Sequence, residues 1–255
     1  MKIAPLSAAM ATAVLFSGAA QSVELTVSIT NLTQGMIFTP RLLVAHTGDV
    51  DLFEPGTEAS EGLTAIAEGG DTSVLAAALD TNGTDQRNQT FGGLVDPAST
   101  SADYTFETND HPFLSLLTML IPTNDAFAGL DSWAIPTAPG TYTVTLNAYD
   151  SGTEANDEVN SGDTTLTGPG GVALGGVGVP GMATPPPTQP NLGRGASGVA
   201  IQQNGGVLED TAAEGRVHIH RNVLGDTNST GGKSDLDATV HRWLNPVARM
   251  TITVN

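Results

Sequence analysis

Residues 140–150 read Gly-Thr-Tyr-Thr-Val-Thr-Leu-Asn-Ala-Tyr-Asp, and the alternation within this stretch predicts the fold. Apolar side chains occupy every second position from Tyr142 to Ala148, and Thr or Asn lies between them. Successive side chains of a β-strand point to opposite faces, so a period of two is typical of a strand with one buried face.

The same alternation recurs near both ends of the chain, in 23–29 and 248–254. A shorter version spans 102–106, and Val217 with Ile219 marks another strand. The run 113–121 is continuously apolar, which fits a central strand covered on both faces. Gly, Pro, Asn and Asp separate these segments. We therefore expect an all-β protein, an antiparallel β-sandwich with long Gly- and Pro-rich loops.

One or two short helices are expected as a minor component. Ser60 can cap a helix over 61–68, which Gly69 and Gly70 end, and Asp71 can cap a second helix over 72–79. Their apolar side chains lie at helical spacing, so both helices are expected to cover one end of the sandwich.

The first 20 residues have the order of a secretory signal peptide. Lys2 provides a positive charge, an apolar stretch follows from Ile3 to Phe16, and small residues end the segment. We predict cleavage after Ala20, with Ser22 as the alternative position and an uncleaved anchor as the alternative role. No second apolar stretch suits a transmembrane helix. The protein is thus expected to be secreted, either periplasmic or extracellular.

Residues 21–255 are expected to form a single β-sandwich domain. Within them, Gly168–Gly198 is dense in Gly and Pro and includes three consecutive prolines at 185–187. Few strands follow this segment, so we interpret it as a long loop inserted between strands of one domain. An interdomain linker is the alternative interpretation.

Composition limits the class of partner. The formal net charge is −18 and there is no cysteine. Such a charge repels nucleic acid and anionic membranes, whereas it suits divalent cations. An exported chain without disulfides must be held by packing, by a metal ion, or by both.

Two acidic turns follow strong strand signals. One carries Asp125 and Asp131, and the other carries Asp150 and Glu154 with Gly152 between them. Calcium prefers several oxygen ligands at about 2.3–2.6 Å, carboxylates above all. Asp150 and Glu154 can reach one point because Gly152 lets the chain fold back, and Asp125 joins them if the two strands are neighbours. Acidic turns of this kind are also ordinary turns, which leaves both interpretations open.

Histidines provide a rival metal site. His218 and His220 are two apart on an expected strand, so both rings leave the same face. With His241 or His111 nearby, they could hold zinc or copper. The favoured alternative is a solvated strand face that carries incidental histidines.

Several segments resemble the spondin domain family, in order and from Val23 to Val254. Tyr149–Glu154 is similar to the family's YDAGTD-type loop, and Ile121–Asp131 is similar to its IPSPDWFVGVD-type segment. Residues 243–252 resemble its closing strand. Further similarity to bacterial members lies in 27–33, 53–59 and 63–71.

This resemblance implies a C2-like, calcium-binding β-sandwich of the kind found in extracellular-matrix and cell-adhesion proteins. It places the calcium ligands on Asp125, Asp150 and Glu154, with Asp131 less securely placed. Glu154 stands where the animal pattern has Asp, and Ala126 stands where it has Trp. The animal cysteines are also missing. Adhesion itself is an analogy at the level of the fold.

We therefore expect a secreted, non-catalytic calcium-binding module that meets an extracellular protein or glycan. A structural subunit of a surface assembly, with possible homo-oligomers, is the first alternative. The second alternative is a secreted glycoside hydrolase that uses carboxylates such as Asp125 and Glu154 as acid and base. The low aromatic content of 5% and the lack of a nucleophile or nucleotide motif disfavour an enzyme.

Overall fold

The computed structural model describes residues 22–81, 86–156, 158, 166–167, 173–174, 214–228, 232–234 and 236–255. The signal peptide expected at 1–20 and most of the Gly168–Gly198 loop lie outside the described residues. The elements, in chain order, are β1 (Glu24–Asn31), β2 (Ile37–Phe38), β3 (Arg41–His46), α1 (Glu61–Gly69), α2 (Ser73–Thr81), β4 (Gln86–Phe91), β5 (Tyr104–Glu107), β6 (Phe113–Ile121), β7 (Ala126–Ala134), β8 (Gly140–Asp150), β9 (Leu166–Thr167), β10 (Ala173–Leu174), β11 (His218–Ile219) and β12 (Ala248–Val254).

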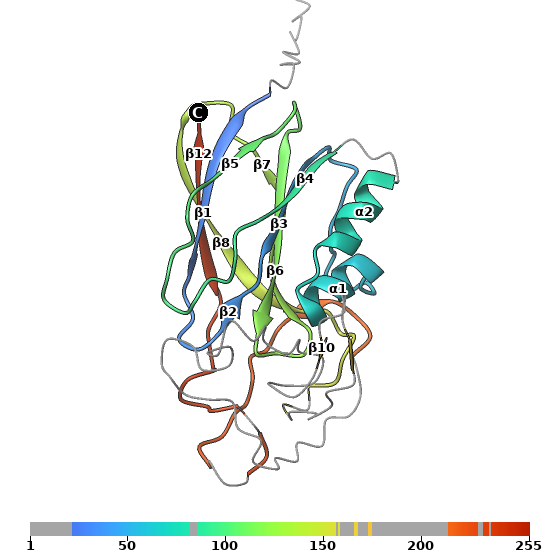
Figure 1. Ribbon diagram of the computed structural model, residues 1–255, viewed down its shortest axis with the longest axis vertical. Helices are drawn as coiled ribbons and strands as arrows, with labels where there is room; N and C mark the ends of the chain where they lie inside the picture. The colour runs from blue at the N-terminus through green and yellow to red at the C-terminus, as the bar shows by residue number, and fades with distance from the viewer. Residues whose placement is uncertain are drawn as a thin grey trace, which may run out of the picture.

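The main sheet is antiparallel and bends until its two edges approach each other. Its strand order is β4-β3-β6-β7-β8-β12-β1-β5, with β2 paired to β6 and β11 paired to β8 (Figure 1). Side chains join the edge strands, because the rings of Phe91 and Tyr104 stack at 4.6 Å and Arg87 lies over Phe106. The expected all-β sandwich is confirmed, in a form close to a barrel.

The expected strands at both ends of the chain are neighbours in the sheet. In β1, Leu25, Val27 and Ile29 are fully buried while their neighbours are more exposed, and β12 alternates in the same way. The two strands pair with Val27 opposite Ile252. Each such apolar side chain stabilises the fold by about 1.5–3 kcal/mol relative to exposure, which holds the two ends together without a disulfide.

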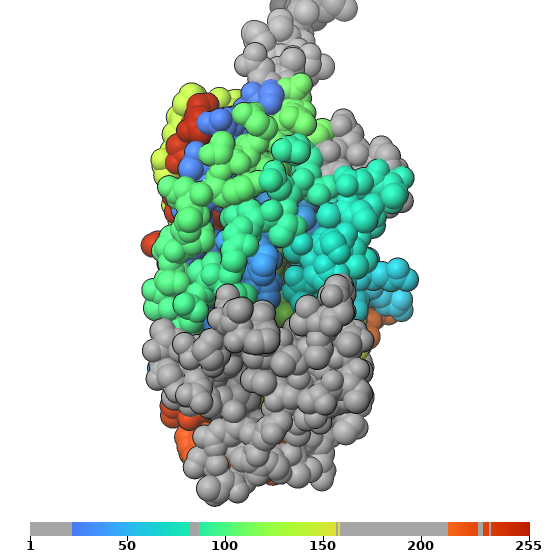
Figure 2. Space-filling model, in the orientation of Figure 1, coloured from blue at the N-terminus to red at the C-terminus, as the bar shows by residue number. Residues whose placement is uncertain are grey.

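Strand β6 is covered on both faces, as its unbroken apolar sequence predicted. Leu116 and Leu120 pack between the layers of the sandwich, whereas Leu117 packs with Leu63 and Ile66 of α1. The helices lie side by side along one flank of the sheet (Figures 1 and 2). The predicted cap is present, because the Ser60 hydroxyl accepts a hydrogen bond from the Leu63 N–H at 3.1 Å.

None of the helices among the described residues is long and apolar enough to cross a membrane.

The close approach of α1 to α2 depends on Gly62. A Cβ at this position would lie 2.7 Å from Leu75 Cα. We expect Gly62→Ala to lower the free energy of unfolding by about 1–3 kcal/mol, the usual cost of overpacking. Urea denaturation measures the change.

Gly69→Ala is the matched control on the same helix. No atom lies within 4 Å of its added Cβ, so the variant should gain about 0.5–1 kcal/mol from helix propensity alone. Equal midpoints for the two variants would contradict the proposed helix contact.

Candidate functional site

The candidate site lies where β8 ends. Asp150 is the last residue of β8, and it is flanked by Ala126 of β7 on one side and His218 of β11 on the other. Because Asp125 directly precedes Ala126, the pairing of β7 with β8 brings Asp125 beside Asp150. The Ser151 N–H donates to the Asp125 carbonyl at 3.2 Å and closes this junction.

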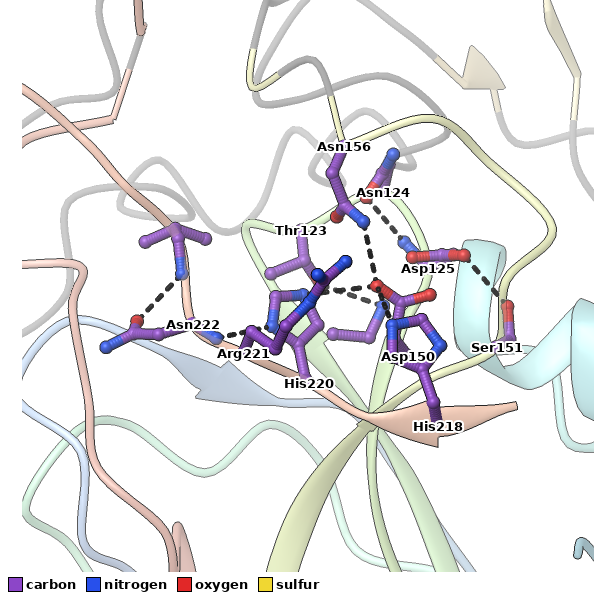
Figure 3. A network of polar contacts seen from close by, with 12 residues as sticks. Thr123, Asn124, Asp125, Asp150, Ser151, Asn156, His218, His220, Arg221 and Asn222 are labelled. Carbon is purple, nitrogen blue, oxygen red and sulfur yellow. Dashed lines mark hydrogen bonds and ion pairs between the residues drawn. The ribbon is translucent and has the colours of Figure 1, made fainter. Parts of the chain in front are cut away.

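Asp125 is a fully buried carboxylate whose two oxygens differ in their hydrogen bonding. Its Oδ2 accepts hydrogen bonds from Ser151 Oγ at 3.1 Å, Thr153 N at 3.0 Å and Glu154 N at 3.2 Å. Its Oδ1 is buried and has no partner among the described residues. Figure 3 shows the side chain between Asn124 and Ser151. A buried carboxylate oxygen without a donor is costly unless a proton or cation meets it.

Burial raises the pKa of Asp125 to about 7, and the charge of Asp150 adds to the shift. The three hydrogen bonds to Oδ2 act in the opposite direction. Burial therefore outweighs the donors. The turn concentrates negative charge that the surrounding protein only partly compensates.

Asp150 is oriented by its own turn and by Asn156. Its Oδ1 accepts from Gly152 N at 2.8 Å, and its Oδ2 accepts from Asn156 Nδ2 at 2.9 Å. The Nε2 atoms of His218 and His220 each lie 3.8 Å from Oδ2. Both rings thus lie on one face of the strand, as their spacing predicted, and there they face one carboxylate (Figure 3).

The expectation of a solvated face fails at His220. The His220 side chain is only 4% exposed, against 29% for His218. Burial lowers the pKa of His220 to about 4, although the nearby Asp150 charge acts in the opposite direction. The short strand β11 folds back onto the end of β8, and this tertiary contact covers a position that the strand pattern alone left exposed.

Glu154 contributes its main chain to the site. Its N–H binds Asp125, and its side chain is half-buried on the same turn. Among the residues that the structure describes, three ligand atoms from different side chains lie within 4.8 Å of one another only in Asp150, Glu214 and His218. The three expected calcium ligands are thus on adjoining turns, and the charge of Asp150 acts directly on Asp125.

Asp131 lies apart from this cluster. We expected it in the turn with Asp125, but the turn is short and β7 begins at Ala126, so Asp131 lies within the strand. Asp131 is therefore about 20 Å along the strand from Asp125, at about 3.4 Å per residue. Its Oδ1 accepts from Leu52 N at 3.0 Å and from Ser115 Oγ at 3.2 Å, which gives it a structural role in anchoring a loop.

Sequence reasoning missed two residues of the site. Asn156 donates to Asp150 Oδ2 and to Glu214 Oε1, both at 2.9 Å, and so joins two carboxylates. Asn156 follows Glu154 by two residues, so its place in the acidic turn was a usable signal. Glu214 is remote in sequence and only the fold brings it here.

Gly152 lets the chain from β11 approach the turn. It has a φ of +72°, and an added Cβ would lie 2.4 Å from the Arg216 carbonyl oxygen. Its carbonyl accepts from Gly215 N at 2.8 Å. A glycine is therefore required at position 152 for two reasons. It allows the turn after β8 to fold back, and it leaves room for the segment that carries Glu214 and His218.

A family model described as Spondin_N matches residues 32–170, just over half of the chain. This range contains Asp125, Asp150 and Glu154, whereas Glu214, His218 and His220 lie beyond it. No curated protein matches the chain.

Gly152→Ala should destabilise the protein beyond the ordinary cost of a left-handed residue, which is about 1–2 kcal/mol. The added methyl group collides with the Arg216 backbone, so β11 must move. Gly56→Ala is the control, because Gly56 also has a positive φ, +97°, but an added Cβ there meets no atom within 4 Å. Thermal melts of the two variants should separate clearly, and equal losses would refute the close approach.

The metal-free protein should lose stability with rising pH because of Asp125. The pKa of this carboxyl is about 7 in the folded state, against 3.8 for an ordinary unburied Asp, so the folded state holds the proton more tightly. The stabilisation is full below about pH 4 and is lost as the pH rises through about 7. Urea unfolding in chelator at several pH values checks this. Relative to Asp125→Asn, the wild type should fall steadily between these limits, and parallel curves would contradict the assignment.

Proposed function

The chain belongs to the Spondin_N family, and on this premise we propose that it is an exported, non-catalytic module that binds calcium at the end of β8. An extracellular protein or glycan is the proposed partner, and adhesion or matrix attachment is the proposed role. Periplasmic and extracellular locations both fit this proposal.

One observation carries the calcium proposal. Asp125 Oδ1 is buried and accepts no hydrogen bond from the part of the chain that the structure describes, while the carboxylate of Asp150 lies beside it. A divalent cation would satisfy the oxygen and offset the repulsion between the two carboxylates, at pH values above about 7 where a proton no longer does so. The donor set also fits, because both residues present hard oxygen ligands of the kind calcium prefers.

The surrounding turn supports the same proposal. Asp125 Oδ2 is held by three donors from 151–154, so this residue is oriented before an ion arrives. Glu154 stands on that turn, and we propose its carboxylate as a further ligand of the ion. Such pre-orientation reduces the entropy lost on binding.

The burial of Asp125 supports a non-catalytic role. A general acid or base must come within hydrogen-bond reach of its substrate. Asp125 is 0% exposed, so it offers no surface to a polysaccharide. A pair of Asp125 and Glu154 therefore makes a poor acid and base for glycoside hydrolysis.

Calcium should raise the melting temperature of the mature protein through Asp125. At a calcium concentration 100-fold above Kd, the stabilisation is about 2.7 kcal/mol. This corresponds to roughly 5–10 °C for a domain of this size. Asp125→Asn should remove the shift, because the amide has no charge to offer the ion. Differential scanning calorimetry with and without calcium measures both proteins.

Asp131→Asn is the matched control. Asp131 is also an Asp of the β6–β7 region, but its carboxylate binds Leu52 and Ser115 instead of facing Asp150. This variant should melt lower in chelator and still gain the full shift with calcium. A calcium-dependent rise in melting temperature that persists in Asp125→Asn, or disappears in Asp131→Asn, would contradict the proposed calcium site.

A further inference from the structure

We propose that Asp150, Glu214 and His218 form a second cation site, which takes a zinc-class divalent ion, and that His220 positions Asp150 within it. The site shares Asp150 with the proposed calcium site but does not depend on that proposal. Its other members come from a segment beyond the part of the chain that matches the family.

The ring of His218 presents a lone pair to Asp150. His218 Nδ1 lies 2.9 Å from the Arg216 carbonyl oxygen, and because a carbonyl only accepts, Nδ1 must carry the proton. In the neutral ring, Nε2 is therefore an acceptor, and it faces another acceptor, Asp150 Oδ2, at 3.8 Å. Two acceptors that face each other repel unless a proton or a metal cation lies between them. A metal-binding His is commonly held through its other nitrogen in this way.

Glu214 adds a carboxylate oxygen that accepts no hydrogen bond from the described residues. Its Oε1 accepts from Asn156 and lies 3.6 Å from Arg221, whose side chain is 77% exposed. Its Oε2 is buried and has no hydrogen bond among the described residues. Asn156 thus fixes both Glu214 and Asp150 while leaving one Glu214 oxygen available.

His220 has the opposite tautomer. The Asn222 N–H donates to His220 Nδ1 at 3.0 Å, so the proton of the neutral ring is on Nε2. His220 Nε2 lies 3.8 Å from Asp150 Oδ2, which is too far for a hydrogen bond. Its N–H is buried and makes no hydrogen bond to any described residue. A small shift of the carboxylate would complete that bond. His220 is therefore a positioning residue and not a ligand.

The three ligand atoms suit a small ion with mixed ligands. They lie within 4.8 Å of one another, and zinc bonds of about 2.0–2.2 Å in a tetrahedral site require about 3.4 Å. The largest contraction needed is about 1.4 Å, within the reach of side chains that are 29% exposed at His218 and 22% at Glu214. An imidazole nitrogen favours zinc over calcium, which prefers six to eight oxygens. Three protein ligands leave a position open to water or to a donor from a partner.

Calorimetric titration of the tag-free mature protein with Zn²⁺ in excess calcium tests the site. We expect one zinc equivalent for the wild type and more than about 100-fold weaker binding for His218→Gln, beyond the 10–100-fold that loss of an outer partner costs. His220→Gln should fall within that smaller range. His111→Gln, at the other end of β6, should bind zinc like the wild type.

Single substitutions distinguish the proposed calcium site from the proposed zinc site. Asp125→Asn should lose the calcium shift and keep zinc, His218→Gln should do the reverse, and Asp150→Asn should lose both. Zinc binding that follows Asp125 instead of His218 would overturn the second site even if the calcium proposal holds.

A measurement on the unchanged protein guards against variants that fail to fold. Addition of Zn²⁺ to ¹⁵N-labelled protein should shift the Nε2 resonance of His218, leave its Nδ1 protonated, and move His220 far less. Co²⁺ in place of zinc should give the intense visible absorption of a tetrahedral site. Unchanged His218 resonances at saturating zinc would refute the proposal.

Discussion

The register of β8 with its two neighbours is the constraint on which the rest of the site depends. Asp150 lies opposite Ala126 on β7 and opposite His218 on β11. Because side chains alternate between faces, a slip of one residue in either pairing would turn Asp150 or His218 to the other side of the sheet. The register itself is held by burial along β8, where Leu146 and Ala148 are inaccessible to solvent.

Electrostatics follows from that register. The pairing places a fully buried carboxylate, Asp125, beside a second carboxylate, Asp150, in a chain that already carries a net charge of −18. Repulsion of this kind opposes folding in the absence of a cation and favours cation binding, so ion binding and stability are coupled in the proposed sites. Donors from the turns occupy one oxygen of Asp125 and leave the other available to an incoming ion.

The two proposed ions would use different chemical features of one end of the sandwich. Asp125 offers hard oxygens within the family-matched region, whereas His218 and Glu214 add a nitrogen and an oxygen from a later segment. Asp150 belongs to both sets, so the ions would influence each other's affinity. Strands β7, β8 and β11 hold these residues on a packed scaffold, which favours precise placement of the ligands.

Much of this protein was readable from local sequence, since alternation in 140–150 and 248–254, the apolar run of 113–121 and the Ser60 cap are short-range consequences of strand and helix geometry. The acidic turns and the shared face of His218 and His220 were likewise visible as spacing. Tertiary structure alone decided that Asp131 lies within β7, that His220 is buried, and that Glu214 reaches Asp150. Those outcomes depend on where β7 begins after the turn that follows β6, and on how β11 folds back onto β8. Such long-range packing leaves no periodic trace in the residues that it brings together.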